Sequence, residues 1–162
     1  MVPDLRGYSV MVLPVQVKTG VPQGLSPDLE IAYALRTRGE GVTWTFPPEI
    51  EEVLRRSPGV RAQIRGLPVQ TFIQAEVNRV GEPLFGNLVR LSGLTGADVA
   101  ILPVELKWGE SGTYQLSAAL IGIRTGRVSW YGVLESSQGE VGDPATLASV
   151  TELLARALFP FG

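Results

Sequence analysis

Residues 10–20 read VMVLPVQVKTG and residues 99–109 read VAILPVELKWG, and these two stretches decide the fold of the chain. Each is an apolar, β-branched run of the kind that forms a strand covered on both faces in a parallel or mixed sheet. Six of the eleven positions are identical, but the flanking sequence does not repeat, so we favour convergence of two neighbouring buried strands over domain duplication. Pro14 and Pro103 cannot donate to a ladder, so each is expected at a bulge or near the end of regular pairing.

Polar side chains follow both prolines. Strand alternation puts Gln16 and Lys18 on one face, and it does the same for Glu105 and Lys107. If the two strands are adjacent and parallel, these four groups cluster at one edge of the sheet, where open α/β sheets favour ligands. Two interpretations stay open for this edge: a ligand or partner contact, and a solvated end of the sheet.

Outward from these strands, hydrophobic periodicity, turn residues and capping residues divide the chain into further elements. The expected elements are a strand at 8–17, a helix at 26–39, a strand at 42–46, a short helix at 49–56, helical spacing at 69–80 and at 84–94, a strand at 99–106, a hairpin of strands 114–120 and 128–134, and a helix at 143–158. The order is β-α-β-α-α-α-β-β-β-α. The sequence therefore predicts a single α/β domain over residues 1–162, with a mixed sheet of about five strands flanked by helices.

Two of these helices depend on particular side chains. Ser26 can cap the first helix, whose apolar stripe comprises Leu29, Ile31, Ala32 and Leu35. The spacing at 69–80 rests on Val69, Phe72, Ile73, Val77 and Val80. Residues 56–68 form the internal segment with the least predicted structure.

The three tryptophans differ in context. Trp44 and Trp130 lie on alternating strands, which predicts that they belong to the core. Trp108 follows the buried strand in a glycine-rich connection. It could anchor an interface or pack over the end of the sheet, and the sequence favours neither.

Composition argues against most kinds of catalytic site. The chain has 162 residues, of which 44% are hydrophobic and 19% charged, with a net charge of −2, so it has an ordinary globular composition and no basic excess for nucleic acid. It contains no Cys and no His, which excludes disulfides and thiolate chemistry and removes the commonest general base. Residues 20–24 do not form a phosphate loop, and neither a nucleophile elbow nor an Asp-rich calcium loop is present. We expect no catalytic residue, cofactor or metal.

The location of the protein is open at this level. No run reaches the roughly 18 apolar residues of a membrane helix, and the opening residues 1–4 do not read as a signal peptide. Either the protein is cytoplasmic from its first residue, or Met1 replaces an export signal that has been removed.

The assembled pattern resembles a group of bacterial envelope proteins. The resembling pieces are the strand ending in Leu-Pro at 10–14, Ser26-Pro27 at the first helix, Gly-Ala-Asp before the strand at 99, and the hairpin at 114–130 with its Thr-Gly turn followed by Trp. The group includes the amino-terminal domain of TolB, the CsgG curli-secretion lipoprotein and the LpoB-type activator of penicillin-binding proteins. The resemblance implies a periplasmic or outer-membrane-anchored protein that acts by binding other proteins, although this chain has no lipid-attachment Cys and no counterpart of the curli channel's pore segments.

Two functions follow as hypotheses. The first is a non-enzymatic, periplasm-facing accessory or assembly domain that binds another envelope protein, using the sheet edge, residues 56–68 or the Trp108 region. The second is a cytoplasmic small-molecule or nucleotide-binding α/β domain, possibly an enzyme, that uses Lys18, Glu105 and Lys107 in a concave pocket.

Overall fold

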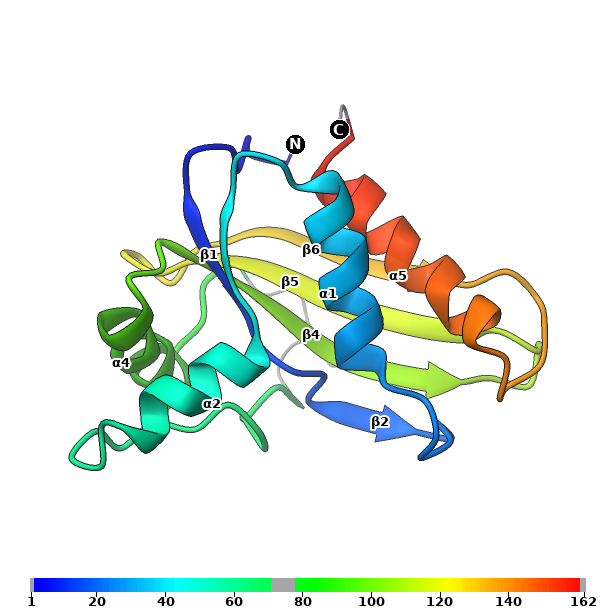
Figure 1. Cartoon of the computed structure of the whole chain (residues 1–162), viewed down its shortest axis with the longest axis horizontal. Coiled ribbons are helices and arrows are strands. Elements are labelled where there is room, and N and C mark those ends of the chain that lie inside the picture. The colour runs from blue at the N-terminus through cyan, green and yellow to red at the C-terminus, as the bar shows by residue number, and fades with distance from the viewer. Residues whose placement is uncertain (1, 71–77, 161–162) are drawn as a thin grey trace.

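A mixed sheet with helices on both faces forms the centre of the molecule (Figure 1). The structure is a computed structural model that describes residues 2–70 and 78–160. Its elements are β1 (Ser9–Val12), β2 (Val17–Thr19), α1 (Pro27–Arg38), β3 (Thr43–Thr45), α2 (Pro47–Arg55), α4 (Leu84–Thr95), β4 (Val99–Trp108), β5 (Tyr114–Gly122), β6 (Val128–Glu135) and α5 (Pro144–Leu158).

The sheet has the strand order β3-β1-β4-β5-β6, with β2 also pairing with β4. β1 is parallel to β3 and β4, and β2 is parallel to β4, whereas β5 is antiparallel to both β4 and β6. The predicted α/β class and mixed sheet are confirmed, with six strands among the described residues where about five were expected. The two stretches that open the sequence argument lie side by side and parallel, as that argument required.

Two cores fill the spaces between the sheet and its helices. One joins α1 and α5 to the first face of the sheet, and its largest fully buried side chain is that of Tyr114. The other joins α2 and α4 to the second face, and it includes Ile50, Leu88 and Leu91. β4 and β5 contribute side chains to both cores, because successive side chains of a strand point to opposite faces of the sheet. Tyr114, Leu116, Ala118 and Leu120 enter the first core, as the hairpin pattern predicted.

The strand predicted at 8–17 is two strands. β1 ends at Val12, and β2 begins at Val17 after a break at residues 13–16. Pro14 lies in this break, and the β4–β5 register shifts between Pro103 and Glu105, so both prolines occupy the irregular positions expected of them. The break lets β2 continue along β4 beyond the end of β1.

The turn between β5 and β6 follows the predicted Thr-Gly pair. Gly126 has a φ of +73°, and a Cβ at this position would lie 2.9 Å from the ring of Phe85 in α4. A side chain would therefore be strained by the backbone and would also collide with α4. The turn sits directly on the helix that covers the second face.

Three details of the predicted helices differ from the structure or lie partly outside its described residues. Leu29 is 65% exposed because it points away from the α1–α5 layer, whereas Ile31, Ala32 and Leu35 are buried as predicted. The side chain of Ser26 makes no capping hydrogen bond. Of the spacing predicted at 69–80, Phe72, Ile73 and Val77 lie outside the described residues. Val69 and Val80 are buried outside any described helix.

Trp44 and Trp130 both pack against the first core, as predicted, and both are half-buried. The Trp44 indole stacks on Phe46 at 5.5 Å between ring centroids and meets Phe159 edge-on at 5.8 Å. Its Nε1–H donates to the carbonyl of Gly39 at 3.1 Å. These contacts tie the end of α1 to β3 and to the end of α5.

Candidate functional site

The ends of β2 and β4 carry the residues that the sequence singled out. The register pairs Val17 with Glu105, Lys18 with Leu106 and Thr19 with Lys107. Partnered residues point to the same side of a sheet, so Lys18 faces the side of Leu106, away from Glu105 and Lys107. The predicted adjacency of the strands is therefore right, but the register divides the four polar groups between the two faces of the sheet.

Gln16 has a structural position that strand parity did not reveal. Its Nε2 donates to the carbonyls of Pro14 and Ile64, both at 2.8 Å, and its Oε1 accepts from the N–H of Leu67 at 3.0 Å. The amide is thus hydrogen bonded at both ends to backbone groups. Gln16 holds residues 64–67 against the break between β1 and β2.

The segment of residues 56–68 contains no helix or strand, as expected, yet side chains anchor it at several points. The buried Asn87 of α4 accepts from the N–H of Gln63 at 2.9 Å and donates to the Gln63 carbonyl at 2.7 Å. Arg90 Nε donates to the carbonyl of Arg61 at 2.6 Å. Together with those of Gln16, these hydrogen bonds satisfy backbone N–H and C=O groups that have no partner strand. These side-chain hydrogen bonds hold the segment in a defined conformation between α2 and α4.

Trp108, at the end of β4, packs over the end of the sheet and stays partly accessible. Its ring meets that of Tyr114 edge-on, with centroids 4.8 Å apart. A Cβ at Gly20 would lie 3.2 Å from the Trp108 Cβ, so the loop after β2 passes close beside it. Trp108 is half-buried against the first core, which leaves part of the indole free for contact.

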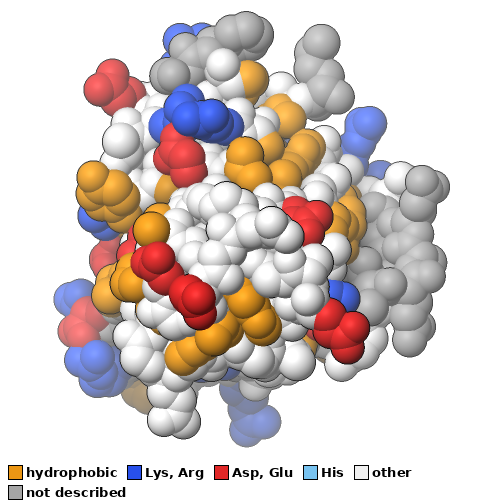
Figure 2. All heavy atoms as spheres, turned by 90° about the vertical axis from the view of Figure 1, so that its right-hand side faces the viewer, with side chains coloured by type: hydrophobic (Ala, Val, Ile, Leu, Met, Phe, Trp, Pro, Cys, Tyr) orange, Lys and Arg blue, Asp and Glu red, His pale blue; other side chains and the backbone are white. Residues whose placement is uncertain are grey.

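Figure 2 looks onto the face that carries these strand ends. Acidic side chains lie across the middle of this face with apolar groups between them, and no deep hollow opens at its centre within the described part of the chain. Two cavities lie elsewhere: one of about 410 Å³ between residues 61–68 and α4, and one of about 560 Å³ beside the two termini. Neither is lined by Lys18, Glu105 or Lys107. These two cavities therefore do not supply the pocket that the small-molecule hypothesis requires at the strand ends.

Among the described residues, the ionisable groups whose pKa is shifted either form ion pairs or lie in the core. A hydrogen bond from Arg6 lowers the pKa of Asp4 to about 2, and a hydrogen bond from Arg38 lowers the pKa of Glu152. Burial raises the pKa of Tyr114, whose hydroxyl donates to the carbonyl of Val141. The described residues contain no cluster of carboxylates able to hold a metal ion. Each shift has a structural cause, and none of these groups is paired with a nucleophile.

Comparison with known proteins gives a result at the level of the fold. No protein-family model and no curated protein matches the sequence. The LpoB C-terminal domain from Escherichia coli matches with a TM-score of 0.52 and 18% identity, over 83% of this chain and 85% of that one. The PelC dodecamer from Paraburkholderia phytofirmans matches with a TM-score of 0.53 and 15% identity, over 97% and 91%. A lipoprotein from Neisseria meningitidis matches with a TM-score of 0.51 and 18% identity, over 93% of each chain.

This chain therefore has the fold of the LpoB C-terminal domain and related lipoproteins. Of the resemblance drawn from the sequence, the LpoB part is supported, while the likeness to TolB and to CsgG stays a prediction. None of the described helices is long and apolar enough to cross a membrane.

Proposed function

We propose that this protein is a non-enzymatic binding module of the bacterial envelope, facing the periplasm, that contacts another envelope protein or protein complex. The observation that supports it is the shared fold with the LpoB C-terminal domain over most of both chains. The sequence resemblance implies the same location and mode of action.

The proposed contact surface is the end of β4 with the adjoining end of β2. Trp108 offers a partly exposed aromatic ring that is already held by Tyr114, so little side-chain freedom is lost on binding. Lys107 precedes Trp108 in β4 and points, exposed, to the opposite face of the sheet, which it shares with Glu105. Lys18 pairs with Leu106 and lies on the same side of the sheet as Trp108. Gln16 supports this surface through its hydrogen bonds to backbone groups and keeps part of its side chain accessible.

The test is affinity capture from native envelope and cytosolic fractions, with this chain as bait. Trp108→Ala and Lys107→Glu should each reduce capture of one envelope protein at least tenfold, since a central aromatic and its flanking charge commonly dominate an interface. Lys107→Glu guards against misfolding, because it changes an exposed charge and removes no packing. Tyr33→Ala removes a 70% exposed aromatic from α1 and serves as the matched control.

The outcomes separate the hypotheses. Capture that survives both Trp108→Ala and Lys107→Glu would place the interface elsewhere on the molecule. Partners from the cytosolic fraction alone would contradict the envelope assignment and favour the small-molecule or nucleotide-binding alternative.

A further inference from the structure

Three arginines gather where the β5–β6 turn meets the chain that enters α4. Arg79 and Arg127 lie directly opposite each other in an antiparallel bridge, so their side chains emerge on the same face. Two backbone hydrogen bonds of 2.8 Å hold this pairing, from the Val80 N–H to the Gly126 carbonyl and from the Val128 N–H to the Asn78 carbonyl. Arg124 adds a third positive charge in the same turn. All three arginines are exposed.

No carboxylate in the described part of the chain pairs with these three guanidinium groups. The nearby carboxylates are engaged otherwise: Glu82 accepts from the N–H of Gly86, and Asp98 accepts from the N–H of Ser9. Like charges directly opposite each other on paired strands are unfavourable in the free protein. The backbone nevertheless fixes this arrangement, because the Gly126 turn packs against Phe85. An anionic partner would relieve the repulsion on binding.

From this arrangement we infer that Arg79, Arg124 and Arg127 form a second interaction surface, which binds an acidic segment of a protein partner. The planar guanidinium fork suits carboxylates, which it can bind with two parallel hydrogen bonds. This inference rests on the proposed function insofar as the partner is a protein. The surface lies at the start of β4, because the Ile123 N–H donates to the Asp98 carbonyl. Trp108 lies at the other end of that ten-residue strand, roughly 30 Å away at about 3.3 Å per residue.

Other anions fit this surface less well. Lipid-binding clusters carry about four to eight basic residues, more than the three present here. Both lysines of the chain lie near the opposite end of the sheet. The two cavities described above do not include these arginines, so an enclosed small anion is not favoured. An extended acidic segment can reach all three charges on an open surface.

The first experiment uses the doubly reversed variant Arg79→Glu/Arg127→Glu in the envelope capture assay. We expect at least a tenfold loss of captured partner, and we expect capture by the unchanged protein to fall as salt is raised. Arg55→Glu/Arg156→Glu alters net charge equally at exposed arginines on α2 and α5 and should capture normally. Arg127→Glu alone should unfold at a higher temperature than the unchanged protein, because it puts opposite charges across the bridge to Arg79. The doubly reversed variant should unfold below the Arg127→Glu single variant, because it again places like charges opposite each other. Undiminished capture by the double variant would overturn the inference while leaving the proposed function standing.

The second experiment does not depend on finding that partner. An amphipathic peptide with alternating Glu and Leu is titrated into the labelled protein and followed by NMR, with its Gln counterpart as control. Shifts confined to the amides of Arg79, Arg124 and Arg127, and absent with the Gln peptide, would support the surface even if envelope capture failed. Equal shifts with both peptides, or binding to phosphatidylglycerol vesicles or inorganic phosphate in preference to the Glu peptide, would contradict it.

Discussion

Gln16 shows how a single side chain can hold a segment that has no secondary structure of its own. Its amide bonds to Pro14, Ile64 and Leu67 join the β1–β2 break to residues 56–68. The sequence suggested a surface role because Gln16 alternates with Lys18. The break at Pro14 interrupts that alternation, so parity counted across it does not predict where Gln16 points.

Replacing Gln16 with Ala should lower the free energy of unfolding by about 2–3 kcal/mol, because backbone groups of Ile64 and Leu67 lose their partner. Urea denaturation measures the change. Gln23→Ala changes an exposed side chain that makes no hydrogen bond within the described part of the chain, and it should alter stability by less than about 0.5 kcal/mol. Equal effects of the two substitutions would show that the Gln16 bonds contribute nothing.

At the scale of the element, a glycine at the end of a helix and a glycine in the interior of a helix have different surroundings. Gly39 follows α1, and a Cβ there would lie 2.4 Å from the Trp44 ring and 2.8 Å from the Leu35 carbonyl. Gly93 lies inside α4 with no atom within 4 Å of an added Cβ. The packing at the end of α1 therefore requires a glycine at position 39, whereas the interior of α4 has room for a side chain at position 93.

Gly39→Ala should destabilise the protein by about 1–3 kcal/mol and alter the fluorescence of Trp44, since the indole must move. Gly93→Ala is its matched counterpart and should stabilise by about 0.5–1 kcal/mol, because Ala loses less backbone entropy in a helix. Thermal unfolding followed by tryptophan fluorescence measures both. A stabilising Gly39→Ala would mean that α1 and β3 are packed less closely than the structure shows.

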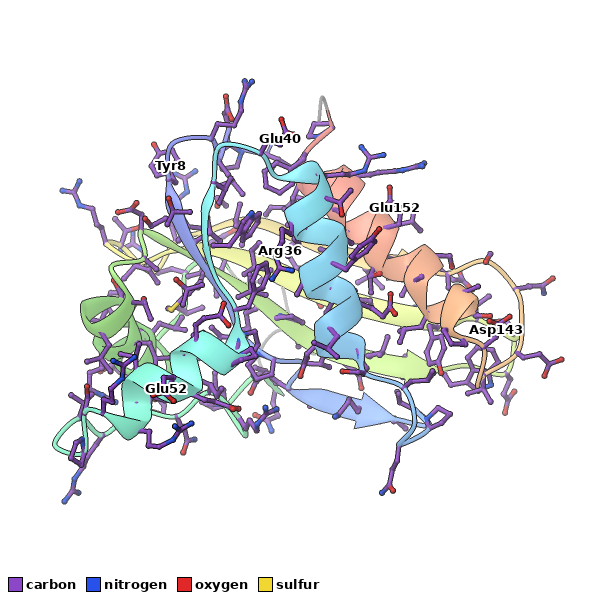
Figure 3. All side chains as sticks on the ribbon, viewed as in Figure 1. Tyr8, Arg36, Glu40, Glu52, Asp143 and Glu152 are labelled. Atoms are coloured by element: carbon purple, nitrogen blue, oxygen red, sulfur yellow. The ribbon has the colours of Figure 1, made fainter. Side chains whose placement is uncertain are left out.

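At the scale of the whole molecule, Glu152 joins α1 to α5 at the surface of their layer, and Figure 3 labels this residue on α5. Its carboxylate accepts from Arg38 Nε at 2.8 Å and from Arg156 Nε at 3.2 Å. Arg38 lies on α1, and the other two residues lie on α5. The lowered pKa of Glu152 reflects these bonds, that to Arg38 most of all. The stabilisation is therefore present above the pKa of the unfolded chain and is lost as pH falls through the folded pKa.

Glu152→Gln should lower the free energy of unfolding by about 0.5 kcal/mol at neutral pH, a small value because Glu152 is partly exposed. The difference from the unchanged protein should disappear in acid, once Glu152 is protonated in both the folded and the unfolded chain. Urea denaturation across a series of pH values tests this, with the exposed Glu140→Gln as control. A difference that persists in acid would mean that packing, and not charge, accounts for the effect.

The sequence by itself determined the class of fold, the two buried strands at the centre of the sheet, the β5–β6 hairpin and the absence of His and Cys side chains. These features follow from local periodicity and composition, which act over a few residues at a time. The resemblance to LpoB-type proteins came from the same local patterns, and the shared fold supports it.

The tertiary structure alone decided where the polar groups of the candidate surfaces lie. Pairing of β2 with β4 sent Lys18 to the opposite side from Glu105 and Lys107, because one residue of register reverses the face of a side chain. The bridge between Arg79 and Arg127 joins residues 48 positions apart, and no local pattern predicts which distant segments pair. The contact of Gln16 with residues 64–67 has the same long-range origin.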